Sequence, residues 1–248
     1  MKTPNIRYLL LAGSVLISTF LSSNSFAAIS LDRTRVIFDG NHKSESINVA
    51  NKNKQLPYLA QAWIENSQGQ KISSPFVVLP PIQRIEPGKA SQVRIEALPE
   101  VKNLPQDRES LFYFNLREIP PKSDKQNVLQ LALQTKIKLF YRPAAINEIY
   151  KTNWQQKLQL IIQGSTVKFK NDSPFYVTII NAAATKAGLA SNRFDPVMIA
   201  PLSETKLAIT ANLLGNAPVL TYINDYGGRP NLFFQCKNNV CHVINDSQ

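Results

Sequence analysis

The chain has 248 residues, 28 lysines and arginines against 17 aspartates and glutamates, and a formal net charge of +11 at pH 7. This length suffices for one large domain or two small ones. The cations are scattered, with no run of five or more. Charge alone therefore gives little support for a nucleic-acid-binding protein, and a basic, solvated surface is the simpler interpretation.

Residues 1–27 have the pattern of a cleaved export signal. Lys2 and Arg7 come before a short apolar run, and Ser25 and Ala27 are the small residues that a signal peptidase requires. The apolar run is shorter than the about 20 residues that span a membrane. We predict cleavage after Ala27 and no membrane insertion, with a retained anchor as the alternative. Removal of Lys2 and Arg7 lowers the formal charge from +11 to +9.

After this segment, apolar and polar residues alternate with a period of two, and long helical periodicity is absent. Turn signals such as Asp39-Gly40 and Pro87-Gly88 separate the alternating runs. The strands predicted before residue 118 lie at 34–38, 45–50, 58–64, 76–79, 82–85, 91–95 and 111–117. With the strand that follows them, they indicate a β-sandwich of immunoglobulin size.

Residues 128–141 form the longest predicted strand, with 14 residues against a common range of about 3 to 10. Successive side chains of a strand point to opposite faces, so Leu129, Leu131 and Leu133 share one face and Lys138 lies on the other. One interpretation is that the strand extends past its neighbours and presents its leucines to another chain. The other is that the leucines fill the domain's own core.

The alternating pattern breaks at residues 142–145, and residues 146–153 are predicted to be a linker with one helical turn. Alternation then resumes in a second set of predicted strands, at 158–162, 166–169, 176–180, 197–199, 205–209, 219–223 and 232–234. We therefore predict two β-sandwich domains, over residues 28–146 and 147–248.

Catalytic motifs are absent from the sequence. The two histidines, His42 and His242, lie at opposite ends of the chain, and no nucleophile elbow, phosphate loop or zinc helix occurs. Catalytic carboxylates cannot be picked out. We predict a binding protein that is not an enzyme and needs no cofactor.

Cys236 and Cys241 are the only cysteines. In an exported protein, an even pair indicates a disulfide, here across a hairpin turn between two strands. A zinc site that adds His242 is the alternative, but it lacks a fourth ligand and the usual spacing. We predict the disulfide and no metal site.

Five strings carry a resemblance to a known family, and they follow one another in order along the chain after residue 27. They lie at residues 30–35, 54–60, 104–115, 135–145 and 223–230. In these strings the chain resembles the periplasmic chaperones of the pilus-assembly (chaperone–usher) family. The cysteine pair is also placed as in that family, whereas residues 181–216 resemble it least.

The resemblance implies two immunoglobulin-like β-sandwich domains set at an angle around a cleft. It also implies a periplasmic chaperone that binds and stabilises pilus (fimbrial) subunits and delivers them to an outer-membrane usher. In donor-strand complementation, such a chaperone lends its own edge strand to a subunit that lacks one. A short loop at residues 118–127 and a first domain without cysteines resemble the subfamily that serves rod-like adhesive pili.

Site residues follow from the same resemblance. Arg35 and Lys138 match the cations that anchor the carboxyl terminus of the subunit, which suits the charge-assisted hydrogen bonds that a carboxylate accepts. Leu129, Leu131 and Leu133 match the donor strand. An ionic link between the domains matches Glu109, Arg142 and Asp225.

Three other functions compete with this prediction. A tandem immunoglobulin-like surface adhesin or structural protein fits the fold but gives no reason for a cation pair at the domain junction. A hydrolase on a β-scaffold needs a nucleophile and base that the sequence does not display, and nucleic-acid binding rests on charge alone. The sequence leaves open which pilus is served and whether the free protein self-associates to cap its edge strand.

Overall fold

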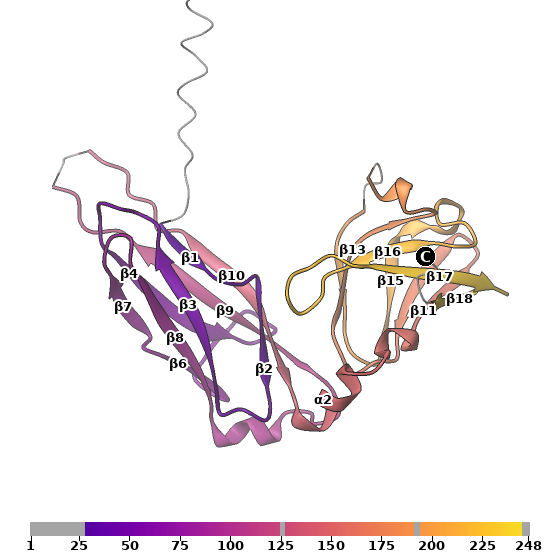
Figure 1. Cartoon of the computed structure of the whole chain (residues 1–248), viewed down its shortest axis with the longest axis horizontal. Helices are drawn as coiled ribbons and strands as arrows, with labels where there is room; N and C mark the ends of the chain where they lie inside the picture. Colours follow the sequence, from indigo (N-terminus) through magenta and orange to yellow (C-terminus); the bar gives the residue numbers. More distant parts are fainter. Residues whose placement is uncertain (1–27, 125–126, 191–193, 245–248) are drawn as a thin grey trace, which may run out of the picture.

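The computed structural model describes residues 28–124, 127–190 and 194–244. Strands dominate these residues and form two β domains joined by a short helical segment (Figure 1). The predicted all-β, two-domain fold class is thus confirmed. The predicted signal peptide, residues 1–27, lies outside the described residues.

The first domain is a sandwich of two sheets. The smaller sheet has the order β1 (Ile29–Leu31), β3 (Ser44–Asn51), β8 (Ala90–Ala97) and β6 (Phe76–Leu79). The larger sheet has the order β2 (Arg35–Asp39), β10 (Gln134–Arg142), β9 (Ser110–Ile119), β4 (Tyr58–Glu65) and β5 (Lys71–Ile72), and β7 (Ile82–Ile85) also pairs with β4. A 3₁₀ helix, η1 (Pro99–Asn103), precedes β9.

Alternation in each strand places one face in the core between the two sheets. In β2, Val36 and Phe38 are fully buried, whereas Arg35 and its alternate neighbours lie on the outer face. Phe38 and Phe76 pack across the sandwich with ring centroids 5.0 Å apart. The outer face of the larger sheet carries polar and aromatic residues, and part of it faces the second domain.

The second domain has eight strands in one hydrogen-bonded path. Their order is β14 (Val197–Ile199), β13 (Val177–Ala183), β16 (Val219–Tyr222), β17 (Asn231–Lys237), β18 (Val240–Ile244), β11 (Leu158–Gln163), β12 (Thr166–Asn171) and β15 (Ser203–Thr210). Short 3₁₀ helices lie at η2 (Trp154–Lys157), η3 (Ala187–Ala190) and η4 (Ala211–Leu213). The end strands β14 and β15 contact each other, so the sheet curls around one core that contains Trp154, Phe175 and Phe234.

The link between the domains is more helical than predicted. Pro143 comes directly before α2 (Ala144–Tyr150), which covers about two turns. The linker is held to the first domain at Gly40, whose N–H donates to the Arg142 carbonyl at 2.7 Å. A Cβ at this glycine would lie 2.8 Å from the Ala144 nitrogen, so the close approach excludes any larger residue.

The prediction of a strand over residues 128–141 is wrong in its first part, because β10 begins only at Gln134. Its pairing with β9 starts where Gln134 lies opposite Arg117, and a single further bond joins the Glu118 N–H to the Leu133 carbonyl. No strand in the described chain pairs with the residues before these. On the other edge of β10, pairing with β2 starts only at Lys138. No described strand pairs with the first four residues of β10 on this side, which we call the free edge of β10.

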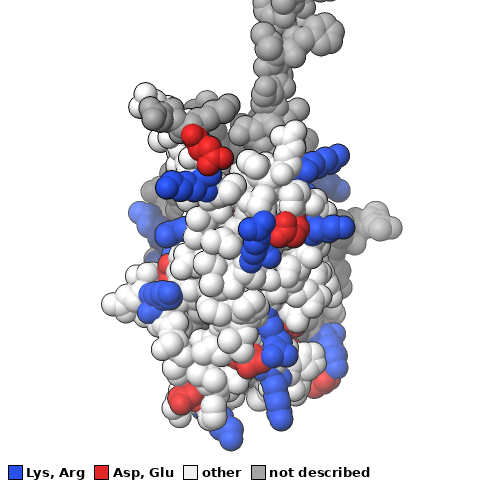
Figure 2. All heavy atoms as spheres, turned by 90° about the vertical axis from the view of Figure 1, so that its left-hand side faces the viewer, with Lys and Arg blue, Asp and Glu red and all other residues white. Residues whose placement is uncertain are grey.

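Cations are dispersed over one side of the first domain (Figure 2). On the side seen in Figure 2, lysines and arginines stand singly or beside an acidic residue, with uncharged surface between them. This side therefore agrees with the interpretation of a basic, solvated surface.

Candidate functional site

Arg35 and Lys138 lie side by side at the junction of the two domains. The parallel pairing of β2 with β10 sets them directly opposite each other, on the outer face of the larger sheet. Each also reaches the second domain: an Arg35 Nη atom donates to the Ile223 carbonyl at 3.4 Å, and Lys138 Nζ donates to Thr178 Oγ1 at 3.3 Å. The structure thus brings together the two cations that the resemblance singled out.

This cation pair has no acidic partner within the described residues, since none of the ion pairs there includes Arg35 or Lys138. Arg35 Nε is buried without a hydrogen-bond acceptor. Burial lowers the pKa of both side chains, and the charge of Arg35 lowers the pKa of Lys138 further. Two half-buried like charges with an unused donor favour an anion between them.

A cavity of about 690 Å³ opens beside Arg35. It is lined by β2, by α2 and by the loop that joins β16 to β17, with Ile37, Tyr150 and Tyr226 among its walls. Arg35 therefore lies at the edge of a cleft between the domains, whereas Lys138 is not among the residues that line it.

Arg142 joins the domains through an ionic network with Glu109 and Asp225. Its Nε donates to Glu109 Oε1 at 2.9 Å, and its two terminal nitrogens donate to the Asp225 carboxylate at 2.8 and 3.1 Å. The other Glu109 oxygen accepts the Tyr176 N–H at 2.8 Å. Since Tyr176 and Asp225 belong to the second domain, the network crosses the junction, and the structure brings together all three residues that the resemblance implied.

Glu109 is 4 % exposed. Burial raises the pKa of its carboxyl to about 7, against the lowering effects of the Arg142 charge and the Tyr176 N–H. The guanidinium of Arg142 also lies over the Tyr150 ring, with its carbon 4.1 Å from the centroid. The junction is therefore closely packed as well as charged.

A loop of the second domain, residues 223–229, lies close to the segment before Arg35. The side chain of Asn224 accepts the backbone N–H groups of Tyr226 at 3.1 Å and Gly228 at 2.8 Å, which fixes the turn. Gly227 has φ +80°, and a Cβ there would lie 2.7 Å from Thr34 Oγ1. Sequence reasoning missed this contact. The run Asn-Asp-Tyr-Gly-Gly predicts a tight turn but does not indicate which residues of the first domain the turn approaches.

Leu129, Leu131 and Leu133 lie next to the free edge of β10 but outside any strand. Their exposed fractions are 84 %, 65 % and 47 %, so the alternative that they fill the core of their own domain is wrong. Three exposed leucines beside an unpaired strand edge form an adhesive surface that soluble proteins usually cover.

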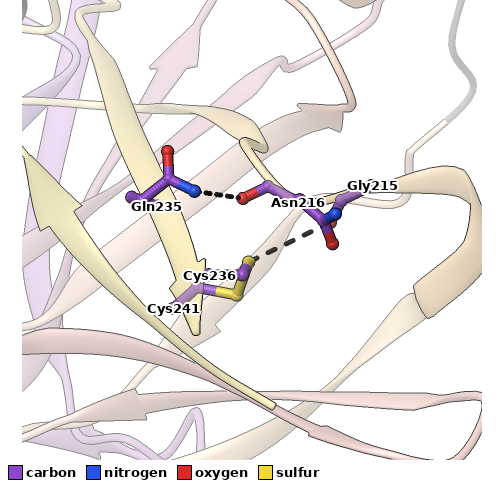
Figure 3. Close-up of a disulfide and its surroundings, with 5 residues drawn as sticks. All are labelled: Gly215, Asn216, Gln235, Cys236 and Cys241. Carbon is purple, nitrogen blue, oxygen red and sulfur yellow. Dashed lines mark hydrogen bonds between the residues drawn. A yellow bond between two sulfur atoms is a disulfide. The ribbon is translucent and has the colours of Figure 1, made fainter. Parts of the chain in front are cut away.

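Cys236 and Cys241 form the predicted disulfide between β17 and β18 (Figure 3). The two residues are directly opposite in the hairpin register, and Cys241 is fully buried. Cys236 also lies near Gly215, with its sulfur 4.0 Å from the Gly215 carbonyl. Both sulfurs are used in the bond, so the alternative zinc site is wrong.

Two family models match the chain, one for each domain. The model described as "Pili and flagellar-assembly chaperone, PapD N-terminal domain" matches residues 28–147, and "Pili assembly chaperone PapD, C-terminal domain" matches residues 153–234. The chain belongs to this family of periplasmic pilus-assembly chaperones, whose role is not enzymatic.

Among individual relatives, the chain is 52 % identical to the chaperone protein PapD of Escherichia coli over 228 residues, which cover 92 % of this chain and 94 % of the relative. It is 46 % identical to the probable fimbrial chaperone YfcS of E. coli K12, over 93 % of each chain. Among solved structures, the YadV chaperone superposes with a TM-score of 0.66 at 30 % identity, over 85 % of this chain and all of the other. The described residues contain no helix that is long and apolar enough to cross a membrane.

Proposed function

We propose that this protein is a periplasmic chaperone that binds pilus subunits, stabilises them by donor-strand complementation and delivers them to an outer-membrane usher. The observation that carries the proposal is the meeting of two features at one point: the free edge of β10 ends at the unpaired cations Arg35 and Lys138. A strand edge supplies backbone pairing that tolerates varied sequences. The cation pair fixes the position at which the bound strand ends.

The geometry of the edge defines the direction of the bound strand. β2 runs parallel to β10 and occupies the same edge from Lys138 onward. A subunit strand on the free part of this edge lies in line with β2 and ends in front of Arg35. If its carboxyl terminus is the group bound by the cations, the strand runs parallel to β10.

Arg35 and Lys138 act as the carboxylate anchor in this proposal. A carboxylate has two oxygens and can accept charge-assisted hydrogen bonds from both cations. It would also remove the repulsion between them. The anchor sets the register of the bound strand, because only one residue of the subunit can carry the terminal carboxylate.

Leu129, Leu131 and Leu133 act as the donor segment. Once residues 128–133 continue β10 as a strand, the three leucines point to one side and enter the groove of a subunit that lacks its last strand. Full burial of a leucine contributes about 1.5 to 3 kcal/mol, so the segment supplies a large part of the affinity. Their present exposure supports this role.

Glu109, Arg142 and Asp225 hold the two domains at a fixed angle. Their role is structural, because the network uses all of its carboxylates internally and offers none to a partner. We place the division between the domains at residue 146, with domains at 28–146 and 147–248. The matches of the two family models, which end at 147 and begin at 153, support this division.

Residues 1–27 serve as a signal peptide that is cleaved after Ala27, which places the mature protein in the periplasm. The protein is not an enzyme and uses no cofactor in this proposal. A surface adhesin remains the competing function, and the unpaired cations at the domain junction favour the chaperone, since an adhesin has no need of them.

The test is co-expression with candidate pilins, followed by pull-down from the periplasm of the wild type and of Lys138→Ala. The proposal expects a one-to-one complex with the wild type only. Capture by both proteins would keep the chaperone function and move the anchor elsewhere. Failure of the wild type with pilins from several gene clusters would favour the adhesin.

A further inference from the structure

The outer face of the larger sheet carries a group of cations and aromatic rings beyond the anchor. The register of β10, β9 and β4 arranges it in rows: Lys138, Tyr113 and Glu65 form the first, and Lys136, Asn115 and Trp63 form the second. Gln134, Arg117 and Gln61 form the third. We call Trp63, Lys71, Tyr113, Arg117 and Lys136 the cation–aromatic face.

The contacts within this face hold its side chains in place. The ring of Trp63 has Arg117 on it, with the guanidinium carbon 5.2 Å from the centroid, and Lys71 Nζ at 5.9 Å. Lys136 Nζ lies 4.4 Å from the Tyr113 centroid. Such contacts fix long cationic side chains, so less rotamer freedom is lost when they bind a partner.

The charges of the face are unbalanced. Glu65, which lies beside Tyr113 in the first row, accepts hydrogen bonds from Lys136 Nζ at 2.6 Å and from Trp63 Nε1 at 2.9 Å. Burial favours the protonated form of Glu65, but these two hydrogen bonds outweigh it and hold the pKa of the carboxyl below its ordinary value. Lys71 and Arg117 are exposed and have no acidic partner within the described part of the chain. The face therefore presents two fixed, uncompensated positive charges.

The face is continuous with the free edge of β10. Strands lie about 4.8 Å apart in a sheet, so a strand bound to this edge has β9, which carries Arg117, about 10 Å away and β5, which carries Lys71, about 19 Å away. Both distances fall within the width of a folded β-sandwich subunit, since a sheet of about five strands is itself about 20 Å or more across.

We infer that the cation–aromatic face is a second contact surface for the bound subunit, and that it takes acidic side chains of the subunit body through Lys71 and Arg117. The inference rests on the proposed function. It assigns to this face the discrimination between subunits, since the anchor and the strand edge recognise groups that all subunits share. Charges at the rim of an interface act mainly on the association rate and on its salt dependence.

A competition measurement tests this inference. A pilin that the wild type captures on co-expression is denatured and then diluted into an equimolar mixture of two differently tagged chaperones. In one mixture the wild type competes with the face variant, which carries both Lys71→Glu and Arg117→Glu. In the other it competes with the control variant, which carries both Lys89→Glu and Lys102→Glu. The control makes the same charge change at two exposed lysines outside the face. The salt is about 0.01 M or about 1 M, which shortens the screening length from about 30 Å to about 3 Å.

At low salt we expect the wild type to capture about ten times more pilin than the face variant. At high salt this preference should fall below about twofold, and the control should capture as much as the wild type at both salts. Equal capture by the face variant at low salt would overturn the inference, as would an equal loss in the control. If the wild type captures no pilin at all, the proposed function fails first and the inference fails with it.

Discussion

Arg35 and Lys138 are directly opposite residues of two parallel strands, and neither forms an ion pair with a carboxylate of the described chain. Like charges in opposite positions of a sheet destabilise it. The free protein thus carries an electrostatic cost at the point where its partner is proposed to bind. A bound carboxylate would remove this cost.

The first prediction concerns this cost. Lys138→Met should raise the free energy of unfolding by about 0.2 to 1 kcal/mol, because it removes the repulsion from Arg35 and keeps the side-chain volume. The same change should abolish subunit capture. Urea denaturation and periplasmic pull-down measure the two effects. A variant that is clearly less stable than the wild type would show that the charge pair does not oppose folding.

The second prediction concerns the donor segment. Leu131→Asp should abolish capture of the subunit, because a charge cannot enter an apolar groove. Its effect on the free energy of unfolding should stay within about 0.5 kcal/mol, since the side chain is exposed. Leu213→Asp, at an exposed leucine of the second domain, is the matched control and should capture normally. Normal capture by Leu131→Asp would remove this leucine from the donor segment.

The third prediction concerns the domain junction. Arg142→Met leaves the buried Glu109 without its cation and should destabilise the protein by about 3 to 5 kcal/mol. Arg33→Met, at a half-exposed arginine paired with Asp32 and Glu45, should cost less than about 1 kcal/mol. Small-angle X-ray scattering should show a wider range of domain angles for the Arg142 variant alone. Similar losses for both variants would contradict a special role of the junction.

The fourth prediction concerns pH. The pKa of Glu109 is raised from 4.5 to about 7 in the folded protein, so the folded state binds this proton more tightly than the unfolded state. The contribution of Glu109 to stability is therefore complete below pH 4.5 and is lost as the pH rises toward 7. Glu109→Gln should remove this part of the pH dependence. Denaturation of the wild type and of Glu109→Gln is measured at a series of pH values from 4 to 8. The same dependence of the free energy of unfolding on pH in both proteins would contradict the prediction.

Much of the fold could be predicted from alternation. β4 and β15 lie within a few residues of their predicted positions, because one face of each is more buried than the other. β9 was predicted from its apolar run, as is typical of a central strand. β1 and β5 were missed, since strands of three and two residues are too short to show a period. The start of β10 was misplaced for another reason: Leu129 to Leu133 alternate like a strand, but a strand also needs a neighbour to pair with.

The site could not be predicted from periodicity. Arg35 and Lys138 are about a hundred positions apart, and only the parallel pairing of β2 with β10 brings them together. Resemblance to the family identified both residues, as it did for Glu109, Arg142 and Asp225. Neither periodicity nor the resemblance predicted the close approach of Gly227 to Thr34, because this approach depends on how the two domains are placed relative to each other.

The carboxylate anchor is tested most directly with a peptide of the last strand of a captured pilin, made once as the free acid and once as the amide. Calorimetric titration compares both peptides on the wild type and on Lys138→Met. We predict that the acid binds the wild type about 10 to 100 times more tightly than the amide, as expected for hydrogen bonds to a charged group. This difference should largely vanish in the variant. Equal binding of acid and amide by the wild type would contradict the anchor.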